Sequence, residues 1–410
     1  MRPSSIIRSD DLRNENRHRL LSTLRRTGPC SPARLKGITG LSAASISTLS
    51  SQMIDQGILV SSRSPASRDR TLRGRPRSQL SLNQSAGHVV TLTLTIDRVR
   101  VQLVNYAGSV CQMQQRSLDT RALSTQQLIR EICQCVDTIC QLQPDLKLHH
   151  IGVAFQGATE HASGCLLWSP IIRVQNVPLG KHLHARYGVT VSVNSDSRLI
   201  SEALSRSHSQ RLGNTFATVL YSHGVGLGLI LNGQPFVGTR SSALELGHLR
   251  FEPDGALCRC GKRGCIEAYA AGYGIARNAS GQNLQANPAG RVSASEMDAL
   301  VADAQAGLPS ALQAFRIAGT AVGEGLVTLF TLLDPMPVAL VGLNDAAFDL
   351  MRHGMESVLD AHLRNGPAAA ELLHYFNHED PFLEQGLIDN CLSCVDQLLA
   401  NHNTDISITG

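Results

Sequence analysis

The sequence predicts a protein of the α/β class in two parts, a small winged helix-turn-helix at the N-terminus and a larger globular body after it. A length of 410 residues suggests two or three folding units, and 42% hydrophobic residues are enough to bury a core. Residues 1–80 hold 15 Lys and Arg against 5 Asp and Glu, whereas the rest of the chain holds 22 against 28. A capped helix-turn-helix pattern lies within the basic part, so the two parts differ in both charge and architecture.

Several classes of protein are excluded by composition. The chain contains no run of 18 apolar residues, so we expect no membrane-spanning segment and no membrane partner. Its first twenty residues lack the apolar stretch of a signal peptide, and we expect a cytoplasmic location. Eleven cysteines in a chain of this length do not indicate a disulfide framework. In a reducing compartment, clustered cysteines indicate metal ligands or buried thiols instead.

The basic part carries the start and stop signals of three helices. Leucines at helical spacing predict a first helix from about residue 15 to 27, which a glycine and a proline end. Ser31 before Pro32 is a typical N-cap of a second helix, which ends near residue 38. Gly40 permits the left-handed backbone of a tight turn. Ser42 then caps a third helix, which runs to about residue 56.

Two helices joined by a short turn, with the second as the reader, form a helix-turn-helix. Residues 58–60 and 79–82 are predicted to be the two strands of a wing. A basic module joined to an acidic body is typical of nucleic-acid binding. Two alternatives stay open: a basic face that is merely solvated, and a small helical domain that binds protein.

The expected contacts with double-stranded DNA come from the third helix and from the wing. The third helix has no Lys or Arg, so its small polar side chains supply little counterion release. Its candidate contacts are Ser42, Ala43, Ala44, Ser45, Ser47 and Thr48. In the wing, Arg73-Gly-Arg75-Pro-Arg77 resembles the core of an AT-hook, whose arginines enter a narrow A·T minor groove. We expect these arginines to carry much of the affinity; the alternative is a basic linker between domains.

A cluster of cysteines and one histidine is the strongest local signal in the acidic body. Gly247-His248 is followed by Cys258-Arg-Cys260 and, after four residues, by Cys265. Three thiolates and one imidazole predict a closed, structural zinc site, because four protein ligands leave no position open for water. The alternative is three buried thiols without a metal. Glu245 and Glu267 flank the cluster, and carboxylates held this rigidly suit a hydroxyl-rich ligand.

These residues resemble the signature of the ROK family (repressors, open reading frames and kinases). The resemblance runs from His223-Gly-Val-Gly-Leu-Gly through Leu-Glu245-Leu-Gly-His248 to Cys258-Arg-Cys-Gly-Lys-Arg-Gly-Cys-Ile-Glu267. The head, with Thr39-Gly-Leu-Ser-Ala-Ala-Ser-Ile-Ser and Gly74-Arg-Pro, resembles the DNA-binding domain of the family's NagC/Mlc-type, sugar-responsive repressors. The resemblance as a whole covers roughly residues 14–350.

The resemblance implies an actin-like (ROK/hexokinase-type), two-lobed α/β body with sugar in the cleft. It implies Zn²⁺ on the four Cys/His ligands and places Asp196 where the kinases of the family have their general base. The implied sugar contacts are Asp196, Glu245, His248 and Glu267. We expect a head over residues 1–82, a first lobe over 83–194 that the C-terminal helix (about 385–410) rejoins, and a second lobe over 195–384.

The sequence also predicts that this chain is not a kinase. The family's kinases carry an Asp-x-Gly-Gly-Thr turn whose backbone cradles phosphate, and here that turn falls on Thr93-Leu-Thr95-Ile96-Asp97. Both glycines are replaced, and Asp97 adds negative charge where phosphate would lie. Without phosphate positioning, Asp196 is expected to bind sugar rather than to catalyse. The glycine run His223–Gly228 has two interpretations that stay open, a phosphate cradle and a tight strand turn.

We therefore expect a bacterial, nucleoid-associated repressor without enzymatic activity. Its operator binding is modulated by a sugar or sugar phosphate through a two-state change, and it acts as a homodimer or tetramer. Three alternatives stay open: a sugar kinase with an accessory DNA-binding head, a regulator that a sugar-transport protein sequesters, and a protein-binding scaffold with a degenerate pocket.

Overall fold

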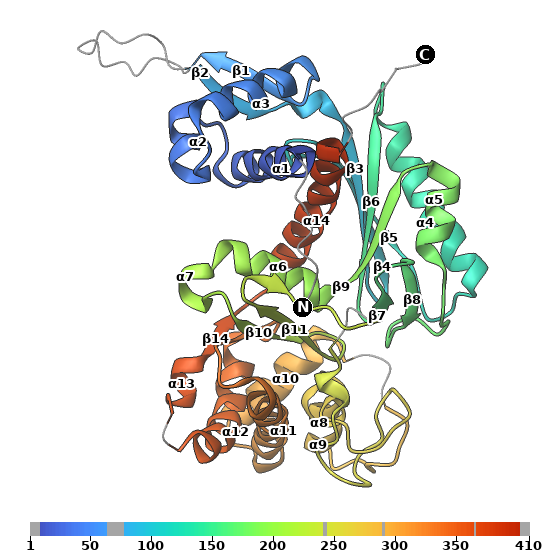
Figure 1. Cartoon of the computed structure of the whole chain (residues 1–410). Helices are drawn as coiled ribbons and strands as arrows, with labels where there is room; N and C mark the ends of the chain where they lie inside the picture. The colour runs from blue at the N-terminus through green and yellow to red at the C-terminus, as the bar shows by residue number, and fades with distance from the viewer. Residues whose placement is uncertain (1–8, 64–77, 241–243, 289–291, 365, 402–410) are drawn as a thin grey trace.

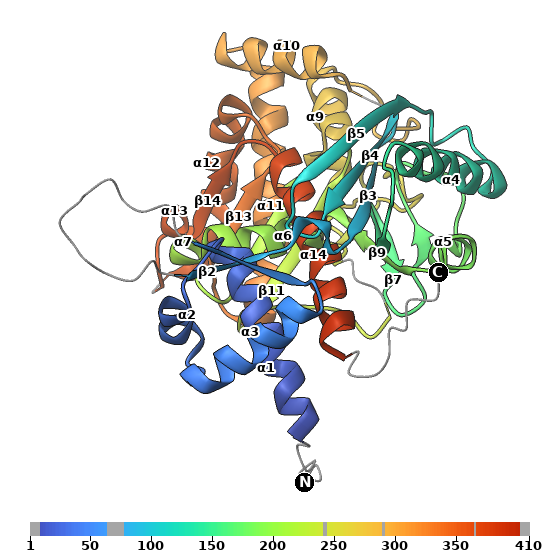
Figure 2. The same cartoon turned by 90° about the horizontal axis from the view of Figure 1, so that it is seen from above.

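The structure is a computed structural model that describes residues 9–63, 78–240, 244–288, 292–364 and 366–401. Figure 1 shows a small helical head above a body of two lobes, each built on its own sheet. The view from above in Figure 2 shows the head seated at one end of the body, with the N-terminal helix pointing away from it.

The head is a winged helix-turn-helix, as the sequence predicts. Its elements are α1 (Ser9–Thr27), α2 (Pro32–Thr39), α3 (Ala43–Asp55) and the antiparallel strands β1 (Leu59–Arg63) and β2 (Ser78–Leu82). The Ser31 and Ser42 side chains cap α2 and α3, and Gly40 ends α2 with a φ of 70°. Helix α1 begins at Ser9, about six residues before the predicted start. The sequence pattern missed these turns because they are mostly polar and lack the leucine spacing.

The core of the head is continuous with the core of the body. Leu20 and Leu24 of α1 belong to the same buried cluster as Leu392 and Val395 near the C-terminus. This cluster joins the head to the C-terminal helix α14 (Asp380–Asn401), which lies beside α1 in Figure 1. The head is therefore packed onto the body rather than tethered to it.

The first lobe is a five-stranded sheet in the order β5-β4-β3-β6-β9. Its first three strands are antiparallel, and β6 and β9 continue the sheet in parallel. Helices α4 and α5 cover one face, and α14 covers the other. The bounds are η1 (Gln84–Ala86), β3 (His88–Leu94), β4 (Arg98–Asn105), β5 (Val110–Ser117), α4 (Thr125–Gln141), β6 (Leu148–Phe155), α5 (Leu179–Tyr187) and β9 (Thr190–Ser195). A separate hairpin of β7 (Ala158–Glu160) and β8 (Cys165–Trp168) follows β6.

The second lobe repeats this pattern in the order β12-β11-β10-β13-β14. Helix α6 covers one face together with α14, and α8 to α12 cover the other. The bounds of its strands are β10 (Phe216–Tyr221), β11 (Val225–Leu231), β12 (Gln234–Pro235), β13 (Val338–Val341) and β14 (Leu373–Phe376). Its helices are α6 (Asp196–Ser207), α7 (Ser209–Leu212), η2 (Leu246–His248), α8 (Glu267–Ala270), α9 (Gly272–Ala279), α10 (Ala294–Gln305), α11 (Pro309–Leu333), α12 (Asp345–Leu363) and α13 (Ala369–Leu372).

Two sheets of repeated topology around a central cleft form the predicted two-lobed, actin-like fold. The C-terminal helix α14 begins at Asp380, about five residues before the predicted start, and packs on β6 of the first lobe and α6 of the second. The predicted domain boundaries stay predictions. Among the described helices, α11 is long and apolar enough to cross a membrane, but half of its apolar window is buried inside the protein, as in a core helix.

Candidate functional site

The four predicted metal ligands converge in the second lobe. One ligand atom from each of His248, Cys258, Cys260 and Cys265 lies within 4.8 Å of the other three. Sγ of Cys260 is 3.7 Å from Sγ of Cys265, and Sγ of Cys258 is 3.7 Å from Nδ1 of His248. Tetrahedral zinc with metal–sulfur bonds of about 2.3 Å keeps neighbouring sulfurs about 3.8 Å apart. The donor set and its spacing therefore fit a zinc ion.

The local backbone explains how distant ligands meet. The amide of Cys258 donates to the carbonyl of Lys262 over 2.9 Å, which folds the loop back on itself. Gly264 has a φ of 74°, and a Cβ there would lie 1.6 Å from the carbonyl oxygen of Glu252. Only glycine fits this turn, and the turn places Cys265 beside Cys260.

The pKa values of the three thiols are shifted in different directions. A hydrogen bond from Cys258, followed by one from His248, lowers the pKa of Cys260, so this sulfur is held as a thiolate. Burial, and after it the negative charge of Cys260, raises the pKa of Cys265 to about 11. A coordinated metal ion would instead hold all three sulfurs deprotonated.

His248 connects the metal cluster to the cleft. Its Nδ1 faces Cys258, while its Nε2 lies 3.6 Å from Oε2 of Glu245. The Trp168 ring, from the first lobe, lies 5.1 Å from the imidazole between centroids. A metal on Nδ1 would fix the ring and leave Nε2–H as a donor directed toward the cleft.

Glu267 lies behind the cluster rather than in the open cleft. It is 2% exposed, and its Oε1 accepts from the Tyr273 hydroxyl over 3.3 Å. Its Oε2 accepts weakly from the amide of Val225 over 3.4 Å. Burial raises the pKa of this carboxyl.

Asp196 lines an inner cavity of about 160 Å³ at the base of the cleft. It begins α6, is 8% exposed, and accepts a hydrogen bond from the amide of Ser197 over 2.7 Å. Burial, and after it the charge of Glu379, raises the pKa of Asp196 to about 7. This carboxyl can therefore exchange a proton near neutral pH.

The residues that replace the phosphate turn form one wall of the inner cavity. Thr95 and Asp97 lie in the tight turn between β3 and β4, where the Thr95 hydroxyl donates to Oδ1 of Asp97 over 3.1 Å. The Thr95 amide donates to the carbonyl of Arg98, and the Ile96 side chain is buried in the core of the first lobe. The Thr95 amide and hydroxyl are thus bonded within the turn, and the Ile96 and Asp97 carbonyls accept from the amides of Thr120 and Leu118. The carboxylates that line the cavity are Asp97, Asp196, Glu379 and Asp380.

The glycine run after β10 has a packing role. Residues 222–224 make a tight turn between β10 and β11, and Gly228 lies within β11. A Cβ on Gly228 would lie 2.0 Å from the Ser201 hydroxyl and 2.4 Å from the Ser197 carbonyl of α6. These contacts explain the glycine at position 228 by its packing on α6, and the two interpretations of the turn at 222–224 stay predictions.

A larger outer cavity of about 820 Å³ lies between the metal loop and the first lobe. Glu245 and His248 line it, whereas Asp196 lines the inner cavity and Glu267 lines neither of these two. The four predicted sugar contacts are thus divided between two cavities and a buried position.

Sequence reasoning missed the first-lobe side of this cavity. Arg121, Trp168 and Arg173 line it, but Trp168 ends β8 and the two arginines lie in connecting segments, all without a motif. Their position before α4 and after β8 gives no signal in the sequence, because only the fold brings these segments opposite the metal loop.

The candidate DNA contacts of α3 lie on its outer surface. Ser42, Ala43, Ala44, Ser47 and Thr48 are exposed, and Ser45 is half-buried. Ser42 also caps the helix by accepting from the amide of Ser45 over 3.0 Å. The wing arginines Arg73, Arg75 and Arg77 lie outside the described residues.

Comparisons with known proteins agree on the family. The ROK family model matches residues 91–380. A protein of Caldicellulosiruptor sp., provisionally named a xylose repressor, is 24% identical over 81% of this chain and 84% of its own length. The DNA-binding transcriptional dual regulator NagC of Escherichia coli is 27% identical over 60% of each chain.

Solved structures support the fold over nearly the whole chain. A ROK family transcriptional regulator, a homologue of the Mlc protein of E. coli, matches 95% of this chain and 98% of its own, with a TM-score of 0.74 and 20% identity. A ROK family glucokinase from Streptomyces griseus, solved with glucose and AMPPNP, matches 74% of this chain and 99% of its own, with a TM-score of 0.57 and 20% identity. The regulator match includes the head, whereas the kinase match leaves about a quarter of the chain uncovered. Because the family model spans residues 91–380, most of the body, this chain belongs to the ROK family.

Proposed function

We propose that the chain is a sugar-responsive transcriptional repressor that binds operator DNA through its head and a sugar or sugar phosphate in its cleft. The observation that carries this proposal is a winged helix-turn-helix packed onto a ROK body through one shared core. Relatives named as repressors support the same function. It acts in the cytoplasm as a homodimer or tetramer, so that two heads meet two half-sites.

The metal in this proposal is a structural Zn²⁺ on His248, Cys258, Cys260 and Cys265. When bound, it supplies no chemistry beyond holding the loop and the imidazole in place, because four protein ligands close the site. The chain's own residues then act on the ligand: Nε2 of His248 donates to a hydroxyl group and Glu245 accepts from one.

The inner cavity supports the absence of kinase activity. Phosphoryl transfer requires positioned and neutralised phosphates. Here Arg98 faces Asp97, Asp196, Glu379 and Asp380 around the cavity, and the turn amide of Thr95 is already bonded to a carbonyl. Asp196, which lines this inner cavity, is therefore not expected to act as a general base.

Helix α14 is the proposed route from cleft to head. It starts at Asp380 on the inner cavity and ends beside α1. Near that end, Asp396 is 1% exposed and accepts two hydrogen bonds from Arg25, over 2.8 and 3.1 Å. The Tyr106 hydroxyl of the first lobe donates to the same carboxylate over 2.7 Å. One buried carboxylate thus holds head, α14 and first lobe together.

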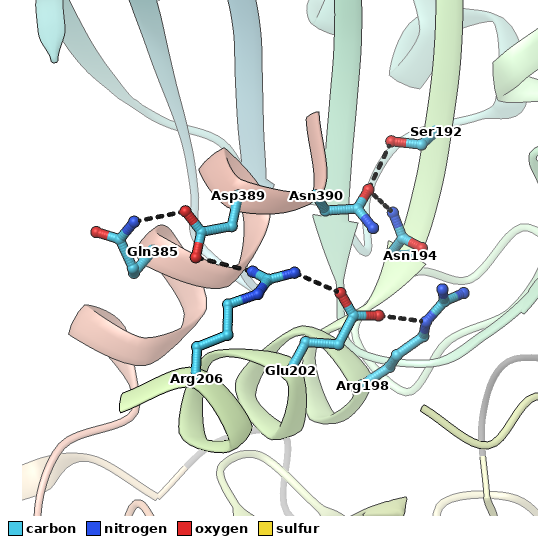
Figure 3. A network of polar contacts seen from close by, with 8 residues as sticks. All are labelled: Ser192, Asn194, Arg198, Glu202, Arg206, Gln385, Asp389 and Asn390. Carbon is cyan, nitrogen blue, oxygen red and sulfur yellow. Dashed lines mark hydrogen bonds and ion pairs between the residues drawn. The ribbon is translucent and has the colours of Figure 1, made fainter. Parts of the chain in front are cut away.

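A second set of contacts ties α14 to both lobes (Figure 3). Arg206 of α6 bridges Asp389 of α14 over 2.8 Å and Glu202 of its own helix over 3.8 Å. The Asn390 side chain accepts from Ser192 and Asn194 of the first lobe, each over 3.2 Å. Movement of α6, which begins at Asp196, would therefore reach α14 through Arg206 and Asp389.

The function is tested with the purified full chain and DNA selected from a random double-stranded pool. We expect specific binding with a Kd on the order of 10⁻⁸ M or tighter at physiological salt, and a change in that Kd when the effector sugar is added. Replacing Arg73, Arg75 and Arg77 together with alanine should weaken binding, while the exposed Arg130→Ala on α4 should not. Hexose-dependent ATP consumption would establish the kinase alternative instead. Sugar-insensitive DNA binding, reversed by a sugar-transport protein, would establish the sequestered regulator.

A further inference from the structure

We propose that the outer cavity binds an anionic sugar whose phosphate or carboxylate group bridges the two lobes. The proposal rests on the proposed function and specifies the ligand of that site. The bridge is formed by Arg121 and Arg173 from the first lobe and by Arg259 and Lys262 from the metal loop of the second.

The lining of the outer cavity has an excess of positive charge. Against these four cations, Glu245 is the one carboxylate among the described residues of the lining, and it faces His248 over 3.6 Å. Within the described ranges, no carboxylate forms an ion pair with Arg121, Arg173 or Lys262. A cavity with walls of one charge concentrates ligands of the opposite charge.

Arg259 is built into the wall rather than free at the surface. Its Nη1 donates to the His223 carbonyl over 2.5 Å, and its guanidinium lies 4.2 Å from the centroid of the Tyr273 ring. Arg121 of the first lobe lines the same cavity as Arg259 of the second, so two like charges from different lobes face one site. An anion between them would replace this repulsion with attraction to both.

The cavity also has the size and the neutral contacts that a sugar needs. Its volume of about 820 Å³ lies within the range of small-molecule sites, roughly 300–1,000 Å³. Trp168 offers an aromatic surface, and Glu245 offers acceptors for hydroxyl groups beside the imidazole of His248. The inner cavity, at about 160 Å³ and with an acidic lining, is both smaller and of the wrong charge for a phosphate.

The two-lobe origin of the cations gives the anion a regulatory effect. Arg121 and Arg173 move with the first lobe, and Arg259 and Lys262 move with the second. A ligand that touches all four binds most strongly when the lobes are close, and such a difference in affinity is what shifts a two-state equilibrium. A neutral sugar, without the bridge, has less preference between the two states.

The test measures ligand binding to the zinc-loaded full chain without DNA. The probes are glucose, mannose and N-acetylglucosamine, their 6-phosphates, glucuronate, and inorganic phosphate, in thermal-shift and calorimetric titrations. We expect at least one anionic probe to bind at least tenfold more tightly than its neutral parent. The double variant Arg121→Ala/Arg173→Ala should remove most of this difference, and Arg130→Ala, an exposed arginine of α4, should retain it. The 6-phosphates and glucuronate distinguish a phosphate from a carboxylate ligand.

Two results would overturn the proposal. One is equal affinity for a neutral sugar and its anionic derivative, in both the wild type and the double variant. The other is the absence of a shift with every anionic probe, including inorganic phosphate. Neither result bears on DNA binding, which is measured separately, so failure of this proposal is distinguishable from failure of the repressor function.

Discussion

The inner and outer cavities share one cleft but are lined by side chains of opposite charge. Arg98 is outnumbered in the inner cavity by Asp97, Asp196, Glu379 and Asp380. In the outer cavity, four cations outnumber Glu245. The position that corresponds to phosphoryl transfer in the family's kinases thus repels phosphate, while the ligand-facing side attracts anions. The proposed absence of phosphoryl transfer and the proposed anion site would therefore have separate structural causes.

The largest effect is expected from breaking the metal cluster, of which His248, Cys258 and Cys260 line the outer cavity. Cys258→Ala or Cys260→Ala should release the metal and lower the free energy of unfolding by about 4 kcal/mol or more. Zinc content and urea unfolding measure this. The exposed Cys111→Ala is the matched control and should keep both values. Full zinc content in the cluster variants would contradict the ligand assignment.

The next largest effect concerns the turn at the wall of the inner cavity. Ile96 is 8% exposed and packs in the core of the first lobe where a glycine would serve a phosphate turn. Ile96→Ala should lower the free energy of unfolding by about 2–4 kcal/mol, because it leaves a cavity. Val110→Ala on the exposed edge strand β5 should change it by less than about 0.5 kcal/mol. An unchanged free energy of unfolding in Ile96→Ala would indicate that this side chain is not packed in the core.

A smaller effect concerns the charge of the inner cavity. Burial raises the pKa of Asp196 to about 7, so the folded state binds this proton more tightly than the unfolded state does. Its contribution to stability is therefore present at acidic pH and is lost as pH rises from about 4 to about 7. Asp196→Asn keeps the acceptor for the Ser197 amide without the charge. The free energy of unfolding of this variant should exceed that of the wild type by about 1–3 kcal/mol at pH 8, and the two should differ little at pH 4.

Chemical denaturation at both pH values measures this difference, with the exposed Asp349→Asn as control. If the stability of Asp196→Asn and that of the wild type change in parallel between pH 4 and pH 8, the pKa of Asp196 is not raised by its burial in the inner cavity.

The smallest effect sharpens the description of the outer cavity. Glu245→Gln removes the one carboxylate of its lining and should strengthen binding of inorganic phosphate about two- to fivefold. Calorimetric titration at low salt measures it, and the gain should shrink in 0.5 M NaCl because the interaction is screened. Unchanged phosphate binding in this variant would place the anion away from Glu245.

The sequence was a reliable guide where local chemistry decides the structure. The caps Ser31 and Ser42 and the turn at Gly40 lie in the predicted places, because an N-cap or a left-handed turn depends on a few neighbouring residues. The Cys₃His cluster was predictable for the same reason, since its spacing fixes three ligands within one loop. The absence of glycines at residues 93–97 is likewise a local feature of the sequence, and the lack of kinase activity inferred from it stays a prediction.

Long-range arrangement was not predictable in this way. The first-lobe residues Arg121 and Arg173 meet the metal loop only after both sheets have folded. The separation of Asp196 from Glu245 into different cavities depends on how the lobes pack, and no spacing encodes it. The contact of Asp396 with Arg25 joins residues 371 positions apart.

The central claim is that an anionic sugar, bridging the lobes in the outer cavity, changes DNA binding without any phosphoryl transfer. It is tested most directly by fluorescence anisotropy of a labelled, selected DNA site during titration with each 6-phosphate and its parent sugar. The account predicts that one sugar 6-phosphate changes the DNA affinity of the wild type at a concentration at least tenfold lower than its parent sugar requires. The variant Arg121→Ala/Arg173→Ala should lose this response while still binding DNA. An equal response to the neutral sugar in both proteins would contradict it.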